Sequence, residues 1–317
     1  MTDTRDTIVV RVPATTANLG PGFDCLGLTL DLWNEAVFTV AGDEVVVTVS
    51  GEGADRLPHD ADNLVVRAFT RLCAQAGAAA PAGLRVDCRV SVPLASGLGS
   101  SASAVVAGLL AANALLGDPA DVAGPIDAAT VLRLATELEG HPDNVAAALR
   151  GGLVVVVRSG DELLTERVET PPVDVALAVP ALEYSTAATR AELPTYVALE
   201  DAVYNMGRAT LVVEALRRGD LELLGKAMED RLHQARRLER VPGGREAMGA
   251  AREAGAAAVA VSGSGPSLIA FVAEAARSGA VAEAMVGALG RAGVASRPLT
   301  LRTTARAATV AVDDRGR

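Results

Sequence analysis

The chain has 317 residues, half of them hydrophobic and only 3% aromatic, and its formal net charge is −10. This length accommodates one large or two ordinary domains, with a core built mainly from Ala, Val and Leu. The excess of acidic groups argues against duplex nucleic acid or an anionic membrane surface as a partner, because both attract basic faces.

The cysteine content and the first residues favour a cytoplasmic protein. Cys25, Cys73 and Cys88 are few and odd in number, as expected for reduced thiols rather than a disulfide framework. Met1–Asp6 is polar and acidic, unlike a signal peptide. The longest apolar run, Ala102–Leu116, is too short to span a bilayer, so we expect no membrane partner.

In the first half of the chain, Val- and Thr-rich runs alternate with segments of helical spacing. The runs predicted as strands are Ile8–Val12, Leu28–Val40, Glu44–Ser50, Leu84–Val92 and Leu153–Val157. The segments predicted as helices are Asn63–Gln75, Ala102–Leu116, Ala128–Leu138 and Pro142–Leu149. A loop rich in Asn, Gly and Pro, at Pro13–Asp24, follows the first strand.

A polar stretch ending in two prolines, Ser159–Pro172, is predicted as the boundary between domains of residues 1–165 and 166–317. The strands predicted beyond it are Val173–Val179, Ala257–Val261, Leu268–Val272, Arg297–Leu301 and Ala307–Val312. The helices predicted there are Leu199–Arg217, Leu221–Arg237 and Ala276–Ala292. Adjacent strands near the N-terminus favour antiparallel pairing, which predicts an α+β fold.

The most informative segment is the glycine-rich turn Pro93–Ser103, which joins a predicted strand to a predicted helix. Backbone N–H groups at the positive end of a helix dipole bind anions, phosphate above all. Gly97 and Gly99 carry no Cβ that would keep the backbone from a phosphate. Ser100 and Ser101 are suited to cap the helix, and their hydroxyls to reach phosphate or Mg²⁺. The turn is neither a P-loop, because it has no lysine, nor a dinucleotide fingerprint, because it lacks G-x-G-x-x-G. The alternative is an ordinary strand-to-helix loop with a good N-cap, because glycine–serine turns are common.

The loop Pro13–Asp24 presents an amide and a carboxylate, on Asn18 and Asp24, between two predicted strands. Such a pair can hold a hydroxyl and an ammonium group. The alternative is a turn in which Asp24 acts only as a cap.

A second candidate carboxylate lies in the segment Glu139–Asn144, between two predicted helices. Glu139 offers hard oxygen ligands, which suit Mg²⁺, and Glu137 is a nearby competitor for that role. The alternative is a helix–helix connection in which His141 or Asp143 is a cap.

Two arginine positions and a second glycine turn complete the candidates. The guanidinium groups of Arg190 and Arg237 suit carboxylate and phosphate, with Arg236 as the alternative to Arg237. In so arginine-rich a chain, each is more commonly a solvated surface charge. The turn Ser262–Ser267 lies between two short predicted strands, so it is either a hairpin turn or a loop that closes over phosphates or substrate.

Taken together and in this order, these motifs resemble the GHMP kinase family. The pattern P-x-x-x-G-L-G-S-S at Pro93–Ser101 is similar to the phosphate loop of the whole family. Three others resemble its homoserine-phosphorylating branch: N-L-G-P-G-F-D at Asn18–Asp24, E-G-H-P-D-N at Glu139–Asn144 and S-G-S-G-P-S at Ser262–Ser267. The sequence departs from the family before Arg237, where H-Q-A-R-R replaces H-E-P-Y-R.

The resemblance implies a two-domain GHMP kinase fold, with an N-terminal ATP-binding domain like ribosomal protein S5 domain 2 and a ferredoxin-like C-terminal domain. It also implies ATP-dependent phosphorylation of the side-chain hydroxyl of L-homoserine to O-phospho-L-homoserine, in threonine biosynthesis, with ATP as co-substrate and Mg²⁺ as cofactor. A homodimer is consistent with it, and the identity of a general base stays open.

The same resemblance implies roles for individual residues. The residues expected to be catalytic are Ser101, Glu139 and Asn144, of which the expected metal ligands are Ser101 and Glu139. The residues expected to bind ATP are Asn63, Pro93, Leu94, Ala95, Ser96, Gly97, Leu98, Gly99, Ser100, Ser101, Ala102 and Ser103, with Asn63 near the adenine base. The residues expected to bind homoserine are Asn18, Asp24, Asn144, Arg190 and Arg237.

Two alternatives stand beside this interpretation. Another kinase of the family, acting on mevalonate or shikimate, would not need Asp24, because those substrates carry no ammonium group. A non-catalytic sensor of a nucleotide or sugar would be expected to lose the metal carboxylate or the loop serines, and this chain keeps them.

Overall fold

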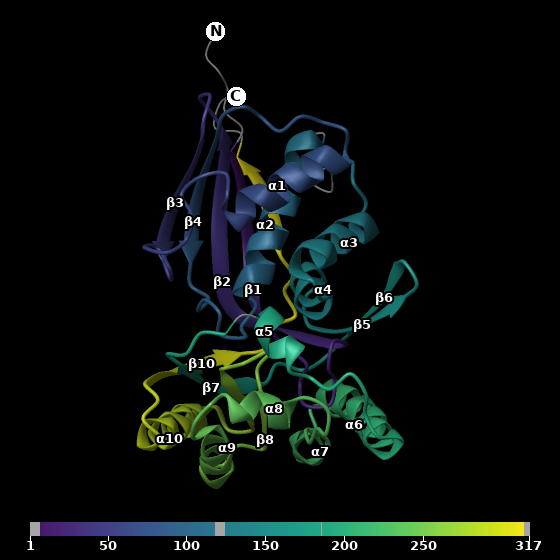
Figure 1. Ribbon diagram of the computed structural model, residues 1–317, viewed down its shortest axis with the longest axis vertical. Helices are drawn as coiled ribbons and strands as arrows, with labels where there is room; N and C mark the ends of the chain where they lie inside the picture. The colour runs from purple at the N-terminus through teal and green to yellow at the C-terminus, as the bar shows by residue number, and fades with distance from the viewer. Residues whose placement is uncertain (1–6, 118–123, 185, 314–317) are drawn as a thin grey trace.

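The computed structural model describes residues 7–117, 124–184 and 186–313. Met1–Asp6, on which the prediction about a signal peptide rests, lies outside them. The described chain forms two bodies, one above the other in Figure 1, each built of a sheet and helices. Within these ranges, no helix has both the length and the apolar character needed to cross a membrane.

The upper body contains a sheet in which the described strands run in the order β11-β1-β2-β4-β3, with the hairpin β5–β6 attached to β2. These strands are β1 (Thr7–Ala17), β2 (Leu26–Val40), β3 (Val45–Gly51), β4 (Leu84–Val90), β5 (Leu153–Ser159), β6 (Glu162–Val168) and β11 (Thr309–Asp313). β3 and β4 are parallel, whereas the other described pairs of this sheet are antiparallel.

Helices pack on the sheet of the upper body (Figure 1). They are α1 (Leu64–Gln75), α2 (Ser100–Leu116), α3 (Ala128–Glu139) and α4 (Asp143–Arg150). α2 is buried along most of its length, and a Cβ on Gly108 would lie 2.1 Å from the carbonyl oxygen of Val65 in α1. The close packing of α1 and α2 therefore requires glycine at that position.

The lower body contains a sheet in the order β10-β7-β9-β8, formed by β7 (Asp174–Pro180), β8 (Ala258–Val261), β9 (Leu268–Val272) and β10 (Ser296–Arg302). Its helices are α5 (Thr186–Ala191), α6 (Leu199–Arg218), α7 (Leu221–Ala227), α8 (Gln234–Glu239), α9 (Gly244–Glu253), the 3₁₀ turn Ala275–Arg277 and α10 (Ser278–Arg291). The α+β prediction is confirmed, although α5 and α9 were not predicted from the sequence.

The prediction of one helix over Leu221–Arg237 is wrong. The helix ends at Ala227 and the chain becomes helical again at Gln234. Between them, the buried Asp230 carboxylate accepts hydrogen bonds from the backbone N–H groups of Leu232, His233 and Gln234, at 3.0, 2.8 and 2.7 Å. A side chain that takes these donors competes with the helical ladder, so the chain turns there.

Three strands also differ from the sequence prediction. β1 continues through the predicted loop to Ala17, paired with β2 across an irregularity between Pro13 and Ala14. The polar stretch predicted as a boundary contains β6, which pairs with β5. β11, near the end of the chain, pairs with β1 in the upper sheet. The division at residues 165 and 166 stays a prediction.

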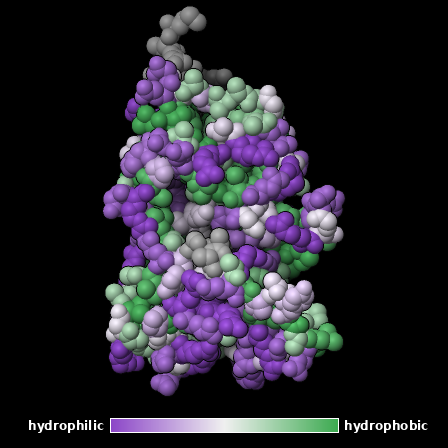
Figure 2. All heavy atoms as spheres, viewed as in Figure 1, coloured by the Kyte–Doolittle hydropathy of each residue, from purple (hydrophilic) through white to green (hydrophobic). Residues whose placement is uncertain are grey.

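One apolar cluster spans the junction between the two bodies. Leu28 and Leu98 from the upper body pack in it with Leu177 and Phe271 from the lower sheet, and all four side chains are fully buried. Polar and charged residues dominate the face shown in Figure 2, with hydrophobic residues in separate groups. The buried cluster fixes the loops on either side of the junction relative to one another.

Candidate active site

A pocket lies at this junction, where loops from both bodies meet. It contains most of the residues that the sequence motifs singled out. The described residues that line it are Asn18, Asp24, Ala95, Ser96, Gly97, Gly99, Ser100, Ser101, Glu139, His141, Asp143, Asn144, Tyr184, Arg190, Arg237, Gly263 and Ser264.

The glycine turn forms one wall of the pocket and leads into α2. Gly99, with φ of 74°, is the N-cap residue, and no side chain caps the helix. The prediction that Ser100 or Ser101 caps it is therefore wrong. The Ser101 hydroxyl instead donates to Oε2 of Glu139 at 2.7 Å. The first N–H groups of α2 have no acceptor within the helix, which makes this end suitable for an anion.

Not every residue of the turn faces this pocket. The side chains of Leu98 and Ala102 are fully buried in the core. Pro93 lines a separate cleft between the two bodies, and Leu94 lines both that cleft and a second pocket beside the first. Binding of ATP stays a prediction for all the residues to which the resemblance assigned it.

A second, more apolar pocket adjoins the first and shares Ala95, Ser100 and Ser101 with it. Asn63 lies in its wall with Val49, Leu57 and Val90, among others. The Asn63 side chain caps α1 by accepting from Val65 N–H at 3.1 Å, and it donates to the Pro58 carbonyl at 2.7 Å. The Asn63 side chain therefore helps to form this pocket by capping α1 and binding the Pro58 carbonyl.

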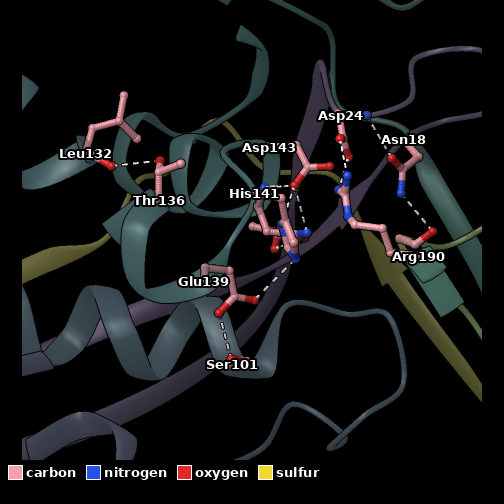
Figure 3. Close-up of polar contacts among 12 residues, drawn as sticks. Asn18, Asp24, Ser101, Leu132, Thr136, Glu139, His141, Asp143 and Arg190 are labelled. Carbon is pink, nitrogen blue, oxygen red and sulfur yellow. Dashed lines mark hydrogen bonds and ion pairs between the residues drawn. The ribbon is translucent and has the colours of Figure 1, made fainter. Parts of the chain in front are cut away.

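A chain of polar contacts runs from α2 to α4 through residues that line the first pocket (Figure 3). Glu139 lies between Ser101 and His141, whose Nε2 is 3.7 Å from Oε1 of Glu139. On its other side, Nδ1 of His141 lies 2.9 Å from Oδ1 of Asp143, which also accepts the backbone N–H of Asn144 at 2.7 Å. The His141 imidazole therefore lies between the carboxylates of Glu139 and Asp143.

Burial raises the pKa of Glu139, and the hydrogen bond from Ser101 opposes this effect. Burial by itself would lower the pKa of His141. The hydrogen bond and charge of Asp143 and the charge of Glu139 outweigh it, so the pKa of His141 is raised. The acidic surroundings therefore favour a positively charged imidazole beside the candidate metal carboxylate.

The structure distinguishes between the alternatives that the sequence left open, Glu137 or Glu139 and Arg236 or Arg237. Glu139 lines the pocket, whereas Glu137 forms ion pairs with Arg71 and Arg133 on the half-exposed side of α3. Arg237 is 6% exposed and lines the pocket, whereas the Arg236 side chain is 60% exposed and lies 3.7 Å from Glu239. Of these four residues, Glu139 and Arg237 line this pocket.

Asp24 and Arg190, which both line the pocket, form an ion pair with two hydrogen bonds (Figure 3). The Nη1–Oδ2 and Nη2–Oδ1 distances are 2.8 and 2.5 Å. Both side chains are partly exposed, and the hydrogen bond to Asp24 raises the pKa of Arg190. Each partner is a charge that a zwitterionic ligand would complement.

Asn18 and Arg237 are joined by the second glycine turn. Asn18 Nδ2 donates to the Gly263 carbonyl at 2.8 Å, and Nη1 of Arg237 donates to the same oxygen. Burial lowers the pKa of Arg237 to about 10, so the guanidinium is still charged at neutral pH. The turn also contacts the phosphate-loop candidate, because Ser262 Oγ donates to the Gly97 carbonyl at 2.8 Å. The turn Ser262–Ser267 therefore packs directly against the turn Pro93–Ser103.

Three residues were missed by sequence reasoning: Tyr184, which lines the pocket, and Thr15 and His233, which contact the segments that form it. Thr15 is fully buried, and its hydroxyl donates to Oδ1 of Asn144 at 2.8 Å. His233 is also buried, and its Nε2 lies 2.6 Å from the Gly20 carbonyl oxygen. Thr15 lies in the segment Pro13–Asp24, in which the sequence singled out only Asn18 and Asp24. For His233, no local pattern indicates a contact with a loop more than 200 residues away.

Family models and curated relatives match segments of both bodies. The model described as "GHMP kinases N terminal domain" matches residues 63–152, and that described as "GHMP kinases C terminal" matches residues 212–292. A homoserine kinase of Moorella thermoacetica is 45% identical over 288 residues, covering 90% of this chain and 94% of the relative. One of Synechococcus sp. strain WH7803 is 43% identical over 307 residues, 94% of each chain.

Solved structures show the same fold. The homoserine kinase from Cytophaga hutchinsonii superposes with a TM-score of 0.83 at 31% identity, covering 98% of both chains. An L. major mevalonate kinase in complex with R-mevalonate reaches 0.67 at 16% identity, covering 94% of this chain and 96% of the other, a likeness of fold alone. The two-domain fold that the motifs implied is confirmed.

Proposed function

We propose, because the chain belongs to the GHMP kinase family and its relatives there are homoserine kinases, that it phosphorylates the side-chain hydroxyl of L-homoserine with ATP. The products are O-phospho-L-homoserine and ADP, and the reaction belongs to threonine biosynthesis. The observation that carries the proposal is the convergence of Asp24, Arg190 and Arg237 with the glycine turn and Glu139 in one pocket.

Homoserine is a zwitterion, and the pocket offers a counter-charge for each of its ionic groups. Asp24 binds the ammonium group, while Arg190 and Arg237 bind the carboxylate. Since Asp24 and Arg190 pair with each other in the structure, the substrate replaces one ion pair by two. A neutral alcohol would break the existing pair without this compensation.

The nucleotide occupies the two adjoining pockets. The adenine base lies in the apolar pocket beside Asn63, and the phosphates lie against the backbone of the glycine turn at the N-terminus of α2. The shared wall at Ser100 and Ser101 brings the terminal phosphate toward the homoserine side. Positioning and charge neutralisation, rather than covalent chemistry by the protein, account for most of catalysis in phosphoryl transfer.

The residues present fit a Mg²⁺ ion. The Ser101 hydroxyl and the Glu139 carboxylate lie 2.7 Å apart at the pocket wall, and hard oxygen ligands of this kind suit Mg²⁺, which keeps waters and phosphate oxygens as its other ligands. No cluster of three or more His, Cys, Asp or Glu capable of holding a metal occurs among the described residues. When bound, Mg²⁺ neutralises charge on the β- and γ-phosphates.

Asn144 orients the acceptor hydroxyl. Its Oδ1 accepts from Thr15 and its Nδ2 donates to Asp143 at 3.2 Å, so both ends of the amide are held. The proton of the hydroxyl passes to Asp143, to solvent or to the phosphate itself. Each of these acceptors is compatible with the proposed reaction.

The proposal is tested by ADP release measured side by side with homoserine, mevalonate and shikimate. We expect homoserine to be used far better than the other two. Preferential use of mevalonate or shikimate would reject homoserine as the substrate. ATP binding without turnover of any small alcohol would indicate a sensor instead of an enzyme.

Asp24→Asn is predicted to raise the KM for homoserine about tenfold or more, with a much smaller change in the KM for ATP. The amide keeps the size of the side chain and one acceptor, but it removes the counter-charge for the ammonium group. The comparison substrate is 4-hydroxybutyrate, which lacks the amine: the wild type should reject it, and Asp24→Asn should discriminate much less. An unchanged preference ratio would show that Asp24 does not recognise the ammonium group.

The proposed compartment is the cytoplasm, where thiols stay reduced; Cys25, Cys73 and Cys88 are free. Assembly into a homodimer stays a prediction.

A further inference from the structure

Phe23 precedes Asp24 in the β1–β2 loop and contacts two of the charged groups of the active site. The Cζ atoms of Arg190 and Arg237 lie 5.3 and 5.4 Å from the centroid of its ring. Both distances fall within the range of about 6 Å in which a cation is attracted to an aromatic ring. Phe23 is not among the described residues that line the pocket.

A second ring packs against the Phe23 ring. The imidazole of His233 lies against it, with a centroid distance of 5.2 Å and an interplanar angle of 34°. Burial lowers the pKa of His233 to about 4, so the ring is neutral at pH 7. Its Nε2, 2.6 Å from the Gly20 carbonyl oxygen, must then be the protonated nitrogen, because a carbonyl only accepts.

The backbone on either side of Phe23 is also fixed. Asn18 and Asp24 have positive φ values of 68° and 58°, which residues with a Cβ rarely adopt. The N–H of Asp24 donates to Oδ1 of Asn18 at 3.0 Å, and this hydrogen bond closes the loop. The loop that carries the ring is therefore held by this hydrogen bond, and the ring itself by its contact with His233.

Such a fixed ring solves an electrostatic difficulty of this site. Two guanidinium groups that bind one carboxylate repel each other. Burial lowers the pKa of Arg237, the charges of Asp143 and Asp24 raise it, and the charge of Arg190 lowers it. Asp24 faces Arg190, but Arg237 makes its hydrogen bond to a backbone carbonyl, which carries no full charge. The electron-rich face of an aromatic ring attracts both cations without occupying the hydrogen-bonding groups that the substrate needs.

We infer that Phe23 is a positioning residue that holds the guanidinium groups of Arg190 and Arg237 in place to bind the carboxylate of the amino-acid substrate. The identity of that substrate rests on the proposed function. The contacts of the ring with the two arginines do not.

The kinetic test compares homoserine with 3-aminopropan-1-ol, which is homoserine without its carboxylate. Phe23→Leu, which keeps an apolar side chain but removes the ring, should lower the preference for homoserine over the amino alcohol about tenfold. The KM for ATP should stay near that of the wild type. Phe23→Tyr keeps the ring and should retain most of the preference. An unchanged preference in Phe23→Leu would overturn the inference.

A spectroscopic arm does not depend on activity. In the wild type, the Nε–H signals of Arg190 and Arg237, assigned with Arg190→Lys and Arg237→Lys, should show shifts caused by the aromatic ring. Both shifts should be lost in Phe23→Leu and kept in Phe23→Tyr. Signals that do not respond to Phe23→Leu would overturn the inference. Failure of the wild type to phosphorylate homoserine would instead reject the proposed function, and the spectra would still decide whether Phe23 positions the arginines.

Discussion

Glu139→Gln is expected to lower kcat about 10²- to 10³-fold while leaving the fold intact, as is typical when one charge-stabilising group is removed from an active site. Glutamine keeps the size of the side chain and an oxygen that can still accept the Ser101 hydroxyl. It removes the negative charge that, in the proposed function, holds Mg²⁺ together with Ser101. The activity should therefore also require a higher Mg²⁺ concentration, which a titration of the rate with Mg²⁺ measures.

Glu137→Gln is the matched control, since Glu137 lies two residues away on the same helix and carries the same charge. Its side chain is half-exposed and pairs with Arg71 and Arg133, away from the pocket. Exposed ion pairs contribute at most about 1 kcal/mol, so near-normal activity and stability are expected. Strong loss of activity in Glu137→Gln, with normal activity in Glu139→Gln, would transfer the metal role to Glu137.

Gly97→Val is expected to abolish ATP binding, measured as the equilibrium affinity for the nucleotide. Gly97 has a φ of 81°, which a β-branched residue does not adopt without strain. A Cβ there would also lie 2.1 Å from the Ser262 carbonyl oxygen and 3.0 Å from the Gly265 nitrogen. The sequence predicted that a side chain would block the phosphates. The structure adds that it would push apart the two glycine turns.

Gly77→Val serves as the control for this experiment. Gly77 has a similar φ of 70°, but an added Cβ would have no other atom within 4 Å. It therefore bears the backbone strain without a clash, and ATP affinity should stay at the wild-type level. Circular dichroism shows whether each variant is folded. A folded Gly97→Val protein with unchanged ATP affinity would refute the assignment of this turn to the phosphates.

The sequence by itself determined the features that depend on a few neighbouring residues. The glycine turn and the helix after it could be predicted because turn chemistry and helical spacing act within about ten residues of each other. The candidate residues Asn18, Asp24 and Glu139 followed from short motifs of the same kind. The structure places all three in one pocket.

The tertiary structure decided between neighbours that the sequence left open. Successive residues of a helix point about 100° apart, so Arg236 and Arg237 face different surroundings, and Glu137 and Glu139 nearly opposite ones. Which of them faces the ligand depends on how each helix packs. In α8, it is Arg237 that faces the second glycine turn, where it donates a hydrogen bond to the Gly263 carbonyl.

Contacts between distant segments were likewise beyond the reach of local patterns. Asp230 ends the predicted helix over Leu221–Arg237 by binding backbone N–H groups that helical periodicity assigns to the ladder. Asp24 and Arg190, which motif analysis assigned separately to the substrate, pair with each other across 166 positions of sequence. The physical reason is common to both cases: a buried or paired carboxylate binds whichever donors the fold brings near, and only the packed chain determines which donors those are.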